Sequence, residues 1–140
     1  MPFPLRPPPN GATNEFKNVP LVHKICEFYK SFYQLSSKLS KRDRFGMYLK
    51  IENICLEIMD LIIEAALESK QNKLRLVIIA HIKIEKLKRF FRMAHELNII
   101  DYKKYISFQA DLREISKNTN NWISYLKNSK VIASENPTQD

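Results

Sequence analysis

At 140 residues the chain has the length of one domain, and its 44% hydrophobic content is enough for a core. Lys and Arg number 23 against 15 Asp and Glu, so the net charge of +8 favours an anionic partner: nucleic acid, an anionic membrane surface or an acidic protein. The alternative is that the charge only keeps a small protein soluble.

The cysteine content and the apolar runs exclude several other classes of protein. Cys26 and Cys55 lie among apolar residues and form no CxxC motif, which argues against a disulfide scaffold or a zinc site. Reduced, buried thiols in a cytoplasmic protein are expected instead. The first residues lack the apolar stretch of a signal peptide, and runs such as LVIIA are too short to span a bilayer.

The two ends of the chain differ in composition from its middle. Residues 1–18 hold five of the seven prolines and one of the two glycines, which predicts a disordered, Pro-rich arm. Residues 131–140 are predicted to form a disordered tail. Between them, residues 19–130 contain only Pro20 and Gly46 as helix-breaking residues, which favours helices over strands and tight turns.

Four segments within residues 19–130 repeat apolar residues at steps of three and four. These segments are 21–39, 48–65, 77–94 and 105–126, the last with one polar position. This spacing keeps side chains on one face of a helix. The joins between the segments are short, so the sequence predicts an all-α fold, an antiparallel up-down four-helix bundle.

Polar residues at the joins provide candidate helix ends. Pro20 suits the first turn of the first helix. Ser40 or Asp43 is expected to cap the second helix. Asn72 is a candidate cap of the third helix and Asp101 of the fourth.

The first half of the third segment has more apolar residues than one core face needs. Ile79 and Ile82 are expected nearly opposite Ile84 and Leu87, and Ile78 also lies off the core face. Single exposed apolar residues are common, but a cluster of them indicates a subunit interface. We therefore expect Ile78, Ile79 and Ile82 to contact a second copy of the chain.

The second half of the third segment is basic. Residues 72–100 contain seven Lys or Arg and two Glu, a net charge of +5. Lys86 and Arg89, with Lys83, are expected on the outward side of the helix, and Arg75 lies further back on the same side. Such a stripe can bind phosphates, although it could also be a solvated helix face. Solvated faces usually mix charges of both signs, so anion binding is favoured.

No catalytic set of residues is evident. The two glycines are far apart, which excludes a Gly-rich phosphate loop, and no Glu-x-x-His motif of a di-iron bundle is present. His81 and Glu85, one turn apart, could bind a metal, but a hydrogen bond on the helix surface is the expected interpretation. Glu52 is either a buried acid with a raised pKa or the partner of a Lys or Arg. No cofactor and no metal are predicted.

Three segments together resemble one protein family. They are KIENICLEIMDLIIEA (50–65), IKIEKLKRFFRMAHELNIID (82–101) and NNWISYL (120–126). Their order and spacing are similar to those of the "four helix bundle protein" group, which includes the accessory variability determinant (Avd) proteins of diversity-generating retroelements. The resemblance covers roughly residues 20–127.

The resemblance implies a four-helix bundle that assembles as a homopentameric ring and performs no catalysis itself. It implies a basic surface that binds the element's reverse transcriptase and RNA or DNA during mutagenic retrohoming. Glu52, Asn53 and His95, which match the family pattern, are expected to be structural. The expected contacts are Lys83, Lys86, Lys88, Arg89 and Arg92, with Arg75 and Lys50 as second choices.

The chain also departs from the family pattern. Tyr48 stands where relatives often have glycine, Lys50 stands where they often have arginine, and Asn120 and Asn121 replace two glycines. The same group contains proteins encoded in intervening sequences of ribosomal RNA genes. The alternative function is therefore a structural or RNA-associated role of that kind.

Overall fold

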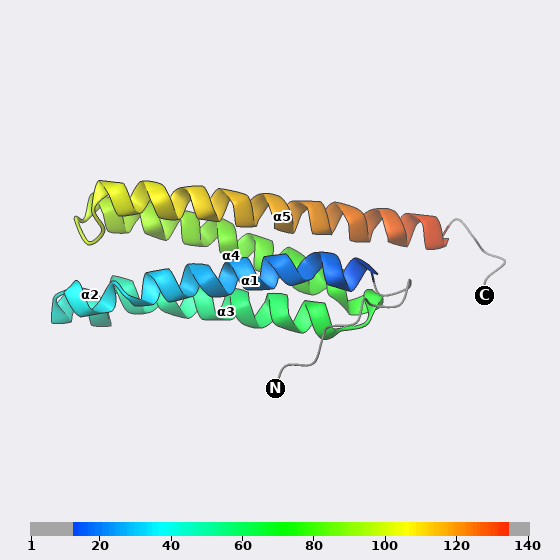
Figure 1. Ribbon diagram of the computed structural model, residues 1–140, viewed down its shortest axis with the longest axis horizontal. Helices are drawn as coiled ribbons and strands as arrows, with labels where there is room; N and C mark the ends of the chain where they lie inside the picture. Colours follow the sequence, from blue (N-terminus) through cyan, green and yellow to red (C-terminus); the bar gives the residue numbers. More distant parts are fainter. Residues whose placement is uncertain (1–12, 135–140) are drawn as a thin grey trace, which may run out of the picture.

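The computed structural model describes the backbone of residues 13–134 and the side chains of residues 20–69 and 71–129. All regular structure in this part of the chain is helical, which confirms the predicted all-α class (Figure 1). A 3₁₀ turn (Ser36–Lys38) and a short helix, α2 (Lys41–Phe45), follow the first long helix. The four long helices pack side by side and are α1 (Thr13–Tyr33), α3 (Met47–Leu67), α4 (Lys70–Glu96) and α5 (Tyr102–Ser134).

The helices extend past the predicted bundle limits of residues 19 and 130. α1 begins at Thr13, so Pro20 lies inside the helix and not in its first turn. A proline there lacks the amide that would bond to the carbonyl four residues earlier, so the helix forgoes one hydrogen bond. α5 continues to Ser134. The rest of the predicted arm and tail, residues 1–12 and 135–140, lies outside the described residues.

The predicted second helix is divided in two at Gly46. Ser40 caps α2, as predicted, because its Oγ accepts a hydrogen bond from the amide of Asp43 (3.2 Å). A Cβ at Gly46 would lie 2.9 Å from a backbone carbonyl of α2, so the backbone conformation of the join between α2 and α3 favours glycine. Asn72 does not cap α4, because it lies inside the helix and donates to Oε1 of Glu68 (3.1 Å).

α4 ends in a Schellman motif. Asn98 has φ 61°, in the left-handed region. The amide of Ile99 donates to the carbonyl of Ala94 (2.8 Å), and the amide of Asn98 donates to that of His95 (3.0 Å). Asp101 then caps α5, as predicted, by accepting a hydrogen bond at Oδ1 from an amide in the first turn (2.8 Å). The turn between α4 and α5 is therefore short and well bonded.

The predicted apolar faces meet in one core. At one end of it Phe28, Phe32, Phe91 and Phe108 contact one another with ring centroids 5.2–6.3 Å apart, mostly edge to face. Thr119, the polar position of the fourth segment, is fully buried, and its hydroxyl donates to a carbonyl one turn earlier (2.7 Å). The hydroxyl is thus satisfied inside the core.

The two ends of the molecule carry different joins. α2 and the α4–α5 turn lie at one end, and the α3–α4 join lies at the other (Figure 1).

Cys55 is buried, which raises the pKa of its thiol, and Cys26 is half-buried; both are free thiols. No helix within the described residues combines the length and the apolar content needed to cross a membrane.

Candidate nucleic-acid interface

Three predicted contact residues lie on the outward side of α4 without an ion pair. Arg75, Lys86 and Arg89 are exposed, and none of them forms an ion pair among the described residues. Their spacing along α4 keeps them on one side of the helix, as predicted. These cations are accessible to an anionic ligand without first breaking a protein contact.

A cluster of lysines surrounds Glu57 where α3 and α4 meet. Nζ of Lys83 lies 2.7 Å from Oε2 of Glu57, and this hydrogen bond holds the pKa of Glu57 below its ordinary value of 4.5. The positive charges of Lys50 and Lys86 lower the same pKa further. Lys50 also lies 5.9 Å from the ring centroid of Phe90. One carboxylate cannot neutralise three ammonium groups, so this side of α4 keeps a positive potential.

An open groove runs between α4 and α5. Within it, Nζ of Lys88 lies 3.1 Å from Glu85, and Nε of Arg92 lies 3.2 Å from Glu96. Exposed ion pairs of this kind contribute about 0–1 kcal/mol, so a phosphate can compete for both cations. The groove is lined by Glu85, Lys88, Arg89, Arg92, Met93, Glu96, Tyr105 and Gln109.

His81 and Glu85 face each other but are not hydrogen-bonded. Nε2 of His81 lies 3.9 Å from Oε1 of Glu85, too far for the predicted hydrogen bond. Glu85 accepts instead from Ser116 (2.9 Å) and Lys88. Burial alone would raise the pKa of Glu85, but these bonds outweigh it, so its pKa lies below 4.5. Nowhere in the described part of the chain do three or more His, Cys, Asp or Glu gather as metal ligands.

Glu52 pairs with a tyrosine, so the prediction of a Lys or Arg partner is wrong. Oη of Tyr29 in α1 donates to Oε2 of Glu52 in α3 (3.2 Å). Burial raises the pKa of Tyr29, and the nearby carboxylate adds to the effect. Burial likewise raises the pKa of Tyr48 to about 12. This polar contact joins α1 to α3 and lies apart from the α4 cations.

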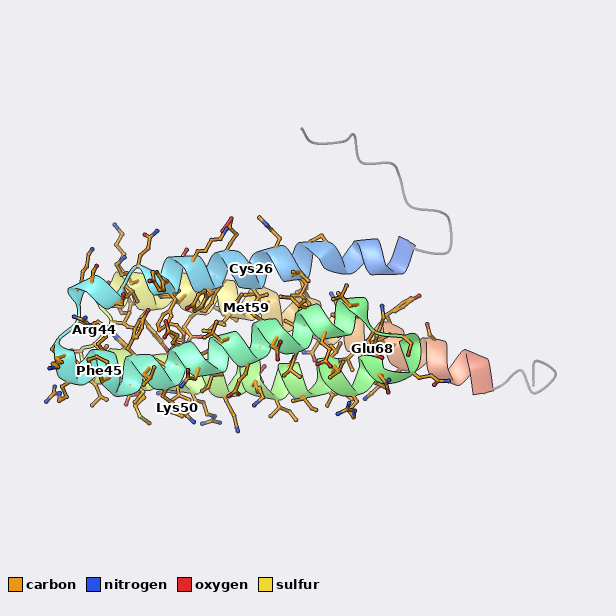
Figure 2. All side chains as sticks on the ribbon, turned by 90° about the horizontal axis from the view of Figure 1, so that it is seen from below. Cys26, Arg44, Phe45, Lys50, Met59 and Glu68 are labelled. Atoms are coloured by element: carbon orange, nitrogen blue, oxygen red, sulfur yellow. The ribbon has the colours of Figure 1, made fainter. Side chains whose placement is uncertain are left out.

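The fold brings together cations that are far apart in the sequence. Residues 31–50 and 86–110 lie at the same end of the molecule, and both segments line one hollow there. Together they contain eleven Lys or Arg and three Asp or Glu, a net charge of +8, equal to that of the whole chain. We term this region the basic end. Figure 2 shows Arg44 and Lys50 toward this end and Glu68 toward the other.

Sequence analysis missed about half of these cations. Four of the missed cations lie in the 3₁₀ turn and α2, which are too short to show a periodic face, and the other two lie in the first turn of α5. The runs KRDR (41–44) and KK (103–104) were the available signal. The residues that were missed are Lys38, Lys41, Arg42, Arg44, Lys103 and Lys104.

The predicted subunit contact on α4 is only partly exposed. Ile82 is 53% exposed, whereas Ile78 and Ile79 are half-buried. α3 carries a further exposed apolar row, at steps of seven residues, of which the sequence pattern placed only Leu49 off the core face. That row consists of Leu49, Leu56 and Ile63.

Comparison with known proteins gives no matching family model, no matching curated protein and no matching solved structure. The retroelement family therefore remains a resemblance carried by the three sequence segments. The arrangement of cations at the basic end is an independent observation, because it depends on the fold and on no relative.

Proposed function

We propose that the protein is a non-catalytic accessory protein of a diversity-generating retroelement. It binds RNA or DNA, and the element's reverse transcriptase, through the basic end and the outward side of α4. The polymerase supplies the chemistry. The observation that carries the binding proposal is the net charge of +8 on the two segments, residues 31–50 and 86–110, that meet at one end of the molecule. The resemblance of the three segments supplies the biological setting.

The α4 cations suit a polyanion in their chemistry and their spacing. Arg75 and Arg89 are fourteen residues apart, so they span about 21 Å of helix at 1.5 Å per residue. Guanidinium groups can hold a phosphate with two parallel hydrogen bonds, and the ammonium of Lys86 adds a point charge. Contacts of this kind fix the position of a nucleic acid and do not read its sequence.

The protein is further proposed to be an up-down bundle that forms a homopentameric ring in the cytoplasm. The short joins, and the packing of each long helix on the next, support the topology. Exposed Ile82, beside Ile78 and Ile79, supports a contact between copies. The number five comes from the resemblance. Light scattering tests the assembly, and the mass of a monomer would contradict it.

Salt dependence of binding tests the proposed surface. Each phosphate contact to a single strand contributes about 0.7 to the slope of log affinity against log salt. The double variant Lys86→Glu with Arg89→Glu should reduce that slope by about 1.4 and weaken binding most at low salt, with a smaller difference from the wild type as salt rises. The matched control is Lys117→Glu with Lys127→Glu on α5, outside the basic end, which makes the same change in charge. Equal effects of the two double variants would contradict the proposal.

The neighbouring genes separate the two branches of the family. A reverse-transcriptase gene and a pair of variable and template repeats next to this gene are expected for the retroelement accessory protein. A position within an insertion of a ribosomal RNA gene would favour the alternative, an RNA-associated bundle. In that case RNA binding by the basic end would remain and the reverse-transcriptase partner would not.

A further inference from the structure

Three aromatic rings lie together where α4 turns into α5. The His95 ring stacks on Tyr105 with centroids 4.6 Å apart and an interplanar angle of 5°, and it contacts Tyr102 at 5.7 Å. Nδ1 of His95 lies 3.2 Å from the carbonyl oxygen of Ile100, which holds the ring in place. Tyr102 is 67% exposed, whereas His95 and Tyr105 are half-buried. Tyr102 therefore presents an open ring on a fixed support.

The three rings border two hollows that both contain cations. Tyr105 lines the α4–α5 groove, while His95 and Tyr102 line the hollow shared with the segment that follows α1. The cations are Lys88, Arg89 and Arg92 in the groove, and Lys38 and Lys104 in the second hollow.

The carboxylates of these hollows are mostly engaged. Glu85 and Glu96 pair with Lys88 and Arg92 in the groove. In the second hollow, Asp101 accepts the capping hydrogen bond of α5. The groove nevertheless holds three cations for two carboxylates, and the second hollow holds two cations for one, so both keep a net positive charge. The exposed ring of Tyr102 borders the second hollow.

We propose that the basic end binds single-stranded nucleic acid, with one base stacked on Tyr102 and the flanking phosphates held by the cations of the two hollows. This inference rests on the proposed function and specifies its ligand. Single strands expose base faces that stack on aromatic side chains, and positive grooves follow their backbones. A duplex keeps its bases stacked on one another and would use the cations alone. RNA and DNA single strands share the required chemistry.

The test uses a short single strand with 2-aminopurine at one position, because stacking quenches its fluorescence. RNA and DNA versions, and a duplex of the same sequence, are titrated into the full chain. Tyr102→Ala should weaken single-strand binding about 5- to 150-fold, the range of base–aromatic stacking, and remove the quenching. Duplex affinity should not change. The comparison of the RNA and DNA strands shows whether the site distinguishes the sugar.

Matched variants separate stacking from bulk and from folding. Tyr102→Phe keeps the ring and should keep both affinity and quenching, whereas Tyr102→Leu keeps apolar bulk and should lose both. Tyr125→Ala removes an exposed tyrosine of α5 outside the basic end and should change neither. Tyr102 is the first residue of α5, and alanine, the best helix former, should be tolerated there. Circular dichroism checks that each variant keeps its helical fold.

The outcomes distinguish this inference from the proposed function. Stacking is overturned if Tyr102→Ala or Tyr102→Leu binds the single strand and quenches its fluorescence like the wild type. The proposed function still stands in that case, provided that Lys86→Glu with Arg89→Glu abolishes binding. Tight binding of the duplex without binding of the single strand has the same consequence. A wild-type protein that binds neither form overturns both.

Discussion

The backbone conformation of one residue sets the geometry of the turn at the basic end. Asn98 has φ 61°, a region that costs most residues roughly 1–2 kcal/mol and costs glycine nothing. Asparagine tolerates it better than residues with apolar side chains. Because this conformation closes the Schellman motif, it fixes where α4 stops and where Tyr102 begins α5.

Substitution of Asn98 tests this account of the turn. Asn98→Ala should lower the free energy of unfolding by about 1 kcal/mol, because alanine is strained in the left-handed region. Asn98→Gly should keep or slightly raise it, since glycine adopts this conformation freely. Urea denaturation of the wild type and both variants measures the difference. Equal stabilities of the Ala and Gly variants would show that the strain is absent.

At the scale of single helices, α4 joins a core face to a cationic outer side. Its core face was predicted correctly, because steps of three and four directly encode one side of a helix. All six predicted residues are fully buried: Val77, Ala80, Ile84, Leu87, Phe91 and Ala94.

The ends of the helices were harder to predict than their faces. The start of α1 before Pro20 was missed, as was the division at Gly46. A proline can lie in the first turn or inside a helix, and only neighbouring packing decides between the two. Asn72 resembles a cap in the sequence, but its side chain bonds to Glu68 within the same stretch of chain.

The contact between α3 and α4 predicts a dependence of stability on pH. The pKa of Glu57 in the folded protein lies below its ordinary value of 4.5 because of Lys83. The pair therefore stabilises the fold above about pH 4.5, and this contribution is lost as the pH falls through the lowered pKa. Because both side chains are partly exposed, the effect should be small.

Lys83→Met removes the partner of Glu57 and should reduce the loss of stability on acidification. Thermal unfolding of wild type and variant between about pH 6 and pH 3 measures this difference. Lys117→Met on α5 removes a lysine for which no ion pair is found among the described residues and is the control. A variant that loses as much stability in acid as the wild type would contradict the role assigned to the pair.

Across the whole molecule, positive charge is concentrated at one end. The basic end carries a net charge of +8, while the remaining residues of the chain contain twelve basic and twelve acidic residues. Such an asymmetric charge distribution steers a polyanion toward the basic end and speeds its association. If copies assemble as a ring, several basic ends can hold one strand, and their combined affinity exceeds that of one end.

The total charge was evident from the sequence, but its location was not. Residues 31–50 and 86–110 are separated in the sequence by residues 51–85, which hold most of α3 and the first part of α4, and only the packing of the helices brings them together. The same holds for the aromatic rings, because Tyr102 and His95 meet only through the tight turn at Asn98. Pattern analysis of single helices finds faces, whereas this candidate site combines part of the outer side of α4 with residues of the joins and the start of α5.

Amide chemical shifts of the labelled protein, recorded while a single-stranded oligonucleotide is added, locate the binding surface most directly. The largest changes should fall within residues 31–50 and 86–110, with smaller changes along the outer side of α4 as far as Arg75 and the smallest around Glu68 at the opposite end. They should shrink as salt is raised, because phosphate contacts are screened. Changes centred on the α3–α4 join, or an absence of changes at low salt, would contradict binding by the basic end.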